Sequence, residues 1–172
     1  MEFDKLVELR ASTRKYRADM PTAEEIDHVI AAGLRAPSGR NMQAPIIIAV
    51  TNKEIRDKLS RANAAVFGVE TDPFYSAPVI LIVLAKTCAR TCVYDGSLTL
   101  GHMMLAAHDI GLGSCWIHRA KEVMAEPEWQ GFIRSLGIED EVIGVGNLAL
   151  GYPDADFATP KPVAEGRVYY VK

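Results

Sequence analysis

Residues 45–51 read PIIIAVT, and this short run decides the class of fold. β-Branched residues dominate it and no polar residue alternates with them, which is the pattern of a strand covered on both faces. Two further runs, residues 78–85 and 142–150, have the same character. Helices are therefore expected on both sides of the sheet that these strands form.

Helical patterns lie between these strands. Thr22 and Glu25 have the spacing of a capping box, and apolar residues then recur at helical spacing as far as Leu34. Residues 53–62 predict a second helix, and residues 93–110 predict a central helix that is apolar on nearly every side.

Shorter segments complete the pattern. We expect a first helix at residues 3–9, a short strand at the end of GLGSCWI (residues 111–117), and helical pieces within residues 120–136. Helices and strands do not alternate regularly, which argues against a doubly wound sheet. The prediction is an α+β fold, a three-layer α/β/α sandwich with a mixed, largely antiparallel sheet.

Length and composition indicate a single domain. The chain of 172 residues is 49% hydrophobic and 24% charged, and its proline-rich end, residues 151–172, is expected to form an arm that lies on another surface. A net charge of −3 argues against nucleic-acid binding, and no apolar run is long enough to cross a membrane. A cytoplasmic protein with three reduced cysteines (Cys88, Cys92 and Cys115) is the expectation.

The segment RASTRKYR, residues 10–17, carries the first candidate site. Arg10, Ser12 and Arg14 occupy alternate positions, so in an extended segment their side chains point the same way. Two guanidinium groups and a hydroxyl suit a phosphomonoester, because arginine presents paired donors to phosphate oxygens. Taken alone, the same residues also fit a solvated basic loop.

The second candidate is APSGRNMQ, residues 36–43. Proline and glycine favour a turn that simply ends the preceding helix. A turn that only ends a helix does not need Asn41 and Gln43. They stand at alternate positions just before a strand, and each offers a donor and an acceptor. Amide groups of this kind suit the edge of a heteroaromatic ring.

GLGSCWI does not match the dinucleotide fingerprint, because Trp116 stands where the last glycine is needed and the segment follows a helix. We interpret it as a close backbone approach to a flat ligand, with free N–H groups around Ile117 to Arg119.

A metal site is not expected, because His102 and His108 fall on different faces of a helix. Cys115 has no evident activating base. The chemistry is therefore expected to come from a cofactor.

The sequence resembles the FMN-dependent nitroreductase family in four motifs taken together. These are RxSxR at residues 10–14, APSGRNMQ at 36–43, LxAAHDIGLGSCWI at 105–117 and NLALGYPD at 147–154. They stand in the family's order and span nearly the whole chain. The resemblance implies an intertwined homodimer with one FMN in each of two sites at the interface. It also implies a single domain, residues 1–172.

The resemblance also implies a role for each motif. Arg10, Ala11, Ser12 and Arg14 would hold the phosphate and ribityl chain, and Arg14 would in addition stabilise negative charge on the flavin. Pro37, Ser38, Asn41 and Gln43 would reach the flavin of the partner subunit. Ile117, His118 and Arg119 would approach the ring, with a backbone N–H facing its reactive nitrogen. Lys161, or else Arg167, would return to the phosphate.

The implied activity is a two-step exchange. NADH or NADPH would reduce FMN and leave, and a nitroaromatic, a quinone or a related small acceptor would then take the electrons. The alternatives are reductive dehalogenation or flavin-modifying chemistry, a flavin-binding protein without turnover, and a module for another phosphate ligand. One departure from the family bears on the acceptor: His118 and Arg119 stand where the family often has small, glycine-rich residues.

Overall fold

The structure is a computed structural model that describes all 172 residues. Its helices and strands, in chain order, are α1 (Phe3–Leu9), α2 (Ala23–Leu34), the short 3₁₀ helix η1 (Gly39–Asn41), β1 (Pro45–Val50), α3 (Lys53–Phe67), β2 (Val79–Lys86), α4 (Cys92–Asp109), β3 (Gly113–Ile117), α5 (Ala120–Ala125), α6 (Pro127–Ser135) and β4 (Val142–Gly151).

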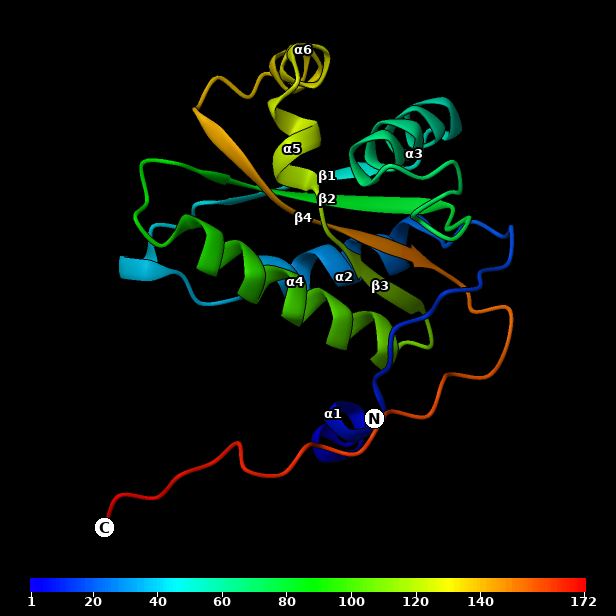
Figure 1. Ribbon diagram of the computed structural model, residues 1–172, viewed down its shortest axis with the longest axis vertical. Coiled ribbons are helices and arrows are strands. Elements are labelled where there is room, and N and C mark those ends of the chain that lie inside the picture. The colour runs from blue at the N-terminus through cyan, green and yellow to red at the C-terminus, as the bar shows by residue number, and fades with distance from the viewer.

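The four strands form one sheet in the order β1-β2-β4-β3, and each neighbouring pair is antiparallel. Helices α2 and α4 cover one face, whereas α3, α5 and α6 cover the other (Figure 1). The predicted three-layer α+β sandwich is thus confirmed. The sheet contains no parallel pair, so its antiparallel character is complete.

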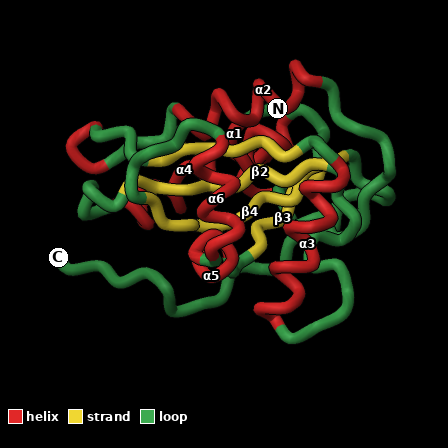
Figure 2. The backbone as a smooth tube through the Cα atoms, turned by 90° about the horizontal axis from the view of Figure 1, so that it is seen from above, coloured by secondary structure: helices red, strands yellow, loops and turns green.

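Each face of the sheet has its own hydrophobic core. Ile80, Ile82 and Leu84 point toward the layer of α3, α5 and α6, where Trp129 and Leu59 meet them. The alternate residues of the same strand point toward α2 and α4. Every residue of β2 from Val79 to Ala85 is fully buried, because this strand is central and covered on both sides (Figure 2).

Strand β1 differs from the expectation that both its faces are covered. It lies at the edge of the sheet, Ile46 and Ile47 are only partly buried, and Ala49 is exposed. An edge strand has a neighbour on one side only, which leaves part of its apolar surface uncovered.

Local signals explain where two helices begin and end. The capping box predicted at the start of α2 is present: Thr22 Oγ1 accepts from the Glu25 N–H, and the Glu25 carboxylate accepts from the Thr22 N–H. Helix α3 runs five residues beyond the expected end, as far as Phe67. Gly68 then stops it in the left-handed conformation, with φ of 75°.

Beyond Gly151 the chain forms no helix or strand. It runs beside α1 and then projects away from the sandwich (Figure 1). Its hydrophobic residues are largely exposed, among them Tyr169 and Tyr170 at 85% and 84%. No helix in the structure combines the length and the apolar character that crossing a membrane requires.

Candidate functional site

The segment from Arg10 to Arg17 lies along the sheet beside β3. The Thr13 N–H donates to the Ser114 carbonyl (2.9 Å), and the buried Tyr16 hydroxyl donates to the Thr13 carbonyl (2.9 Å). A Cβ built at Gly113 would lie 2.7 Å from the Thr13 side chain. Gly113 therefore leaves space for the chain's own N-terminal segment at this point, rather than for a ligand.

Arg10, Ser12 and Arg14, here called the Arg10 cluster, all act on the thiol of Cys115. Burial raises the pKa of Cys115, while Arg14, Ser12 and Arg10 act in the opposite direction, so all three groups lie within electrostatic reach of one sulfur atom. Arg10 Nη1 is buried and has no hydrogen-bond partner. A buried N–H without an acceptor costs about 1–3 kcal/mol, and an anion would supply the acceptor.

A pocket of about 750 Å³ connects Arg10 with the C-terminal segment. Residues of α1 form one wall, and Thr159 to Val163 form the other. Lys161 lines this pocket together with Arg10, whereas Arg167 does not. The fold thus brings two predicted phosphate ligands, Arg10 and Lys161, to one cavity.

The APSGRNMQ turn is a tight polar structure. Arg40, Asn41 and Gln43 all have positive φ values, between 49° and 54°. Gln43 donates its N–H to Ser38 Oγ (2.9 Å), and its side-chain amide donates to Asn41 Oδ1 (3.3 Å). The turn exposes both amides while fixing them relative to each other.

This turn is anchored at the start of α4, far from Arg10. The Gly39 N–H donates to Asp95 in the first turn of α4 (3.1 Å), and a Cβ at Gly39 would collide with Thr91. Arg10 instead lies near His108 in the last turn of α4, where it lowers the pKa of that histidine in addition to the larger effect of burial. Asp95 and His108 are thirteen positions apart, which spans roughly 20 Å of helix. One chain therefore does not bring the two predicted motifs together.

The end of β3 is held by a buried amide on α3. Asn63 Nδ2 donates to the His118 carbonyl (3.0 Å), and Arg119 Nε donates to Asn63 Oδ1 (3.0 Å). Since C=O and N–H of a trans peptide point in opposite directions, the Arg119 N–H points away from α3. No hydrogen bond of a turn, loop or cap uses this N–H as its donor.

A second pocket, of about 290 Å³, opens at this end of β3. Three aromatic residues, Phe67, Tyr75 and Trp116, line it together with His118 and Arg119. Its remaining wall is the loop from Val69 to Tyr75. Burial raises the pKa of Tyr16 in the N-terminal segment, and Tyr75 of this pocket adds a smaller effect in the same direction.

Asp72 fixes this loop. Its carboxylate accepts from Ser60 Oγ (2.6 Å), from the N–H groups of Phe74 (2.9 Å) and Ser76 (2.8 Å), and from the Arg56 guanidinium. Burial alone would raise the pKa of Asp72, but these hydrogen bonds outweigh it and the pKa is lowered. The pocket wall that carries Tyr75 is therefore preorganised.

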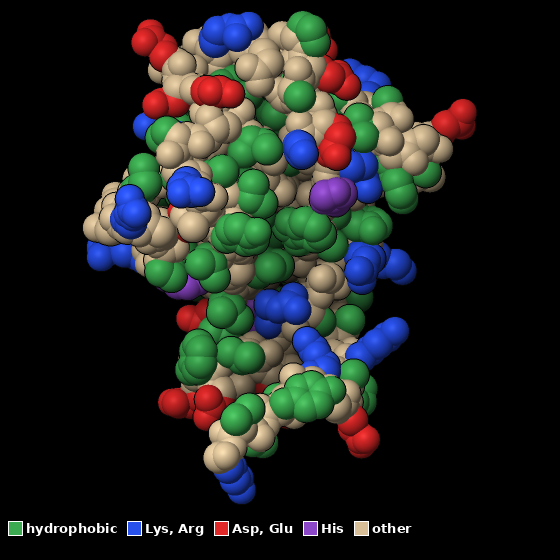
Figure 3. Space-filling model, turned by 60° about the vertical axis from the view of Figure 1, so that its left-hand side comes forward, with side chains coloured by type: hydrophobic (Ala, Val, Ile, Leu, Met, Phe, Trp, Pro, Cys, Tyr) green, Lys and Arg blue, Asp and Glu red, His purple; other side chains and the backbone are tan.

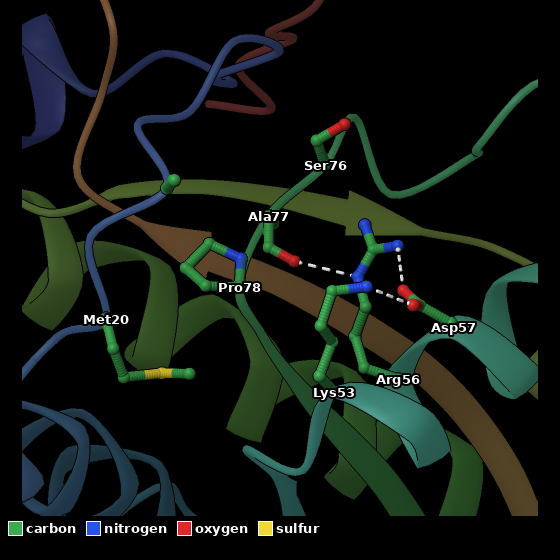
Figure 4. A pocket seen from close by; sticks show the side chains of 8 residues that line it. Met20, Lys53, Arg56, Asp57, Ser76, Ala77 and Pro78 are labelled. Carbon is green, nitrogen blue, oxygen red and sulfur yellow. Dashed lines mark hydrogen bonds and ion pairs between the residues drawn. The ribbon is translucent and has the colours of Figure 1, made fainter.

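A third pocket, of about 380 Å³, lies beside Arg56 (Figure 4). Arg56 donates to the Ala77 carbonyl (2.9 Å) and pairs with Asp57 (3.2 Å), and Lys53 pairs with Asp57 as well (2.5 Å). Its cations are already neutralised, so this pocket is a poor site for an anion.

No group of three His, Cys, Asp or Glu side chains is placed to hold a metal ion.

The sequence patterns missed Asn63, Asp72 and Tyr75. Only Asn63 left a signal, because an amide stands four residues after Leu59 on the apolar face of a helix. Asp72 and Tyr75 lie in a loop with no periodicity, so only the folded chain shows what they contact.

An antiparallel α/β/α sandwich with a basic segment beside its sheet defines a class of protein with many known members. The profile of the nitroreductase family matches residues 7–79. A relative from Archaeoglobus fulgidus, named "Putative NADH dehydrogenase/NAD(P)H nitroreductase", is 30% identical over 153 residues, which cover 87% of this chain and 84% of the relative. A relative of the same name from Methanothermobacter thermautotrophicus is 28% identical over 157 residues, 89% of this chain and 78% of its own.

Solved structures of nitroreductases have the same fold as this chain. A nitroreductase from Bacteroides fragilis, crystallised with bound FMN, superposes with a TM-score of 0.87 over 100% of both chains at 26% identity. A nitroreductase from Desulfitobacterium hafniense, also with bound FMN, has a TM-score of 0.85 at 23% identity, over 98% of this chain and 97% of that one. The chain belongs to the nitroreductase family.

Proposed function

We propose that the protein is an FMN-dependent oxidoreductase that transfers electrons from NADH or NADPH to a nitroaromatic, a quinone or a similar small acceptor. The observation that carries the proposal is the buried, unpartnered Nη1 of Arg10, which lies in the same cluster as Ser12 and Arg14. A phosphate monoester supplies acceptors for all three groups. Family membership and the FMN-bound relative from Bacteroides fragilis support the same cofactor.

The remaining residues offer the charge and the hydrogen-bonding groups that a flavin needs. Lys161 lines the pocket of Arg10 and adds a second cation for the phosphate. The N–H of Arg119 points away from α3 and is free to donate to a ring atom. Asn41 and Gln43 expose amides that match the mixed donors and acceptors of a flavin ring edge.

The site requires two copies of the chain. The amide turn and Arg10 lie at opposite ends of α4, roughly 20 Å apart along the helix. A second chain brings its own turn to the first chain's Arg10 cluster, and the reverse holds by symmetry. A homodimer with two shared sites is therefore part of the proposal.

Uncovered hydrophobic surface supports the same homodimer. Tyr94 and Leu98 on α4 are 73% and 47% exposed, although the helix sequence is that of a covered element. Figure 3 shows hydrophobic side chains gathered in a band across one face of the molecule. Val168 to Val171 in the C-terminal segment are exposed as well. We propose that this segment is an arm that packs on the second subunit.

Bound FMN supplies hydride acceptance from a nicotinamide and two-electron donation to an acceptor. The protein binds and orients the reactants. Arg10 and Lys161 would neutralise the phosphate, Arg14 would add a positive charge to the site, and the Arg119 N–H would be available to donate a hydrogen bond to the ring. For a nitro acceptor the balance is Ar–NO₂ + NAD(P)H + H⁺ → Ar–NO + NAD(P)⁺ + H₂O, in which one N–O bond breaks and nitrogen gains two electrons.

A visible spectrum of the purified protein, recorded before and after anaerobic addition of NADH or NADPH, tests this function. The expected result is a flavin spectrum that bleaches on addition of the nicotinamide and returns when a quinone is added. A flavin that does not bleach would instead define a flavin-binding protein without turnover. A protein that takes up no FMN would contradict the proposal.

A further inference from the structure

The cavity at the end of β3 has a composition that selects its ligand. Phe67, Tyr75 and Trp116 provide flat apolar walls, and a volume of about 290 Å³ is just below the range of drug-sized sites. A volume of this size suits one substituted aromatic ring.

The same cavity carries a positive charge that the protein does not neutralise. Arg119 pairs with no carboxylate, whereas the one acidic residue of the wall, Asp72, is already bonded to Arg56 and three other donors. The Arg119 guanidinium uses Nε toward Asn63, which leaves both terminal nitrogens without a protein partner. A carboxylate could accept from them in a bidentate manner.

Arg119 is held in place rather than free. Its guanidinium carbon lies 4.1 Å from the centroid of the Phe67 ring, and its Nε bond to Asn63 is 3.0 Å long. Its backbone has φ of 75°, a conformation that costs a side chain roughly 1–2 kcal/mol and costs glycine almost nothing. Arg119 thus combines a strained backbone, two side-chain contacts and a place in the pocket lining, a combination typical of functional sites.

We infer that the cavity of Phe67, Tyr75, Trp116 and Arg119 binds the electron acceptor, and that it selects single-ring aromatic acceptors that carry a carboxylate. The ring lies between the aromatic walls, and the carboxylate pairs with the guanidinium of Arg119. The inference rests on the proposed function, because the ligand is called an acceptor only if the protein reduces it.

Two pairs of matched compounds test the inference. Binding of benzoate and of its neutral isostere benzamide is measured by calorimetry, which needs no turnover. Reduction of 4-nitrobenzoate and of 4-nitrobenzamide is then compared as kcat/KM. The anion is expected to be favoured about tenfold or more in both comparisons, as one charge-assisted pair provides, and the preference is expected to fall as salt is added.

Variants assign the effect to one residue. Arg119→Gln should reduce the preference to within about threefold, and Arg119→Lys should retain most of it, because the charge remains. Arg134→Gln, which removes an exposed arginine of α6, should leave the preference unchanged. A wild-type protein that binds benzoate and benzamide equally would overturn the inference. So would an Arg119→Gln variant that weakens both ligands equally, since the arginine would then serve the cofactor or the fold.

The two proposals fail in different ways. If the protein takes up no flavin, the oxidoreductase function fails, but calorimetry still decides whether the cavity selects the carboxylate. If flavin binds and bleaches while the charged and neutral acceptors react alike, the function stands and the acceptor inference is wrong.

Discussion

Asn63 fixes Arg119. The buried amide accepts a hydrogen bond from Arg119 Nε and donates one to the His118 carbonyl, each at 3.0 Å, so a single side chain of α3 sets both the guanidinium and the backbone at the end of β3. This arrangement links the helix layer to the residues that we propose meet the flavin and the acceptor.

Replacing Asn63 tests that link. Asn63→Ala should lower the free energy of unfolding by about 2–3 kcal/mol, because two hydrogen bonds are lost and one of them is to a charged group. It should also reduce the preference for 4-nitrobenzoate, though less than Arg119→Gln does. Asn52→Ala is the control: it removes the cap of α3, costs about 1 kcal/mol, and should not change the preference. An unaltered preference in Asn63→Ala would show that Arg119 needs no support from α3.

Arg10 is expected to retain the flavin. Arg10→Ala should weaken FMN binding by about 1.5–3 kcal/mol, roughly 10- to 150-fold, since a charge-assisted contact to phosphate is removed. The measurement is a fluorescence titration of apoprotein with FMN. Arg17→Ala is the matched control, because that guanidinium lies over Tyr152 and pairs with Asp19 instead. Equal affinities for the two variants would contradict the phosphate assignment.

Arg14 is expected to act on the potential of the flavin. Removing a cation from the flavin site disfavours added negative charge, so Arg14→Ala should lower the midpoint potential by roughly 20–60 mV. A spectroelectrochemical titration with reference dyes measures it. Lys15→Ala provides the comparison, because adjacent side chains of an extended segment point to opposite sides. An unchanged potential in Arg14→Ala would remove this role from the residue.

Shared sites predict complementation between two defective chains. Arg10→Ala and the double variant Asn41→Ala/Gln43→Ala should each lose flavin as homodimers. A heterodimer purified through two different tags should recover half the wild-type flavin content, because one of its sites then combines the intact Arg10 with the intact turn. If each site were built within one chain, both sites of the heterodimer would carry a defect and no flavin would be recovered.

The Asp72 carboxylate should make stability depend on pH. Its pKa is lowered in the folded protein, so its stabilising effect is complete above the unfolded value of about 4 and is lost as the pH falls below that value. Asp72→Asn should therefore cost about 2–3 kcal/mol at pH 7, and the difference from wild type should shrink near pH 3. Urea unfolding at several pH values measures this.

A surface pair gives the contrast for Asp72. Asp140 contacts Lys86 at 2.8 Å, but both side chains are well exposed, so Asp140→Asn should change the free energy of unfolding far less than Asp72→Asn does at pH 7. If Asp72→Asn behaves in the same way, the loop from Val69 to Tyr75 is held by something other than its carboxylate.

Local patterns in the sequence were enough to predict most helices and strands of the fold. The capping box at Thr22, the β-branched runs of the buried strands and the helical spacing of α2 depend on neighbours a few residues away, so they can be read along the chain. The same holds for the spacing of Arg10, Ser12 and Arg14, and for the family resemblance that these motifs carry. The end of α3 and the exposure of β1 were the exceptions, since one depended on a glycine cap and the other on a place at the sheet edge.

Only the tertiary structure decided which distant groups meet. It placed the amide turn and Arg10 at opposite ends of α4, brought Lys161 to the pocket of Arg10, and joined Asn63 to Arg119 across 56 positions of sequence. The physical reason is that secondary structure follows from short-range sterics and periodicity. A binding site instead depends on how whole layers pack against one another, and that packing is set by contacts between residues far apart in the chain.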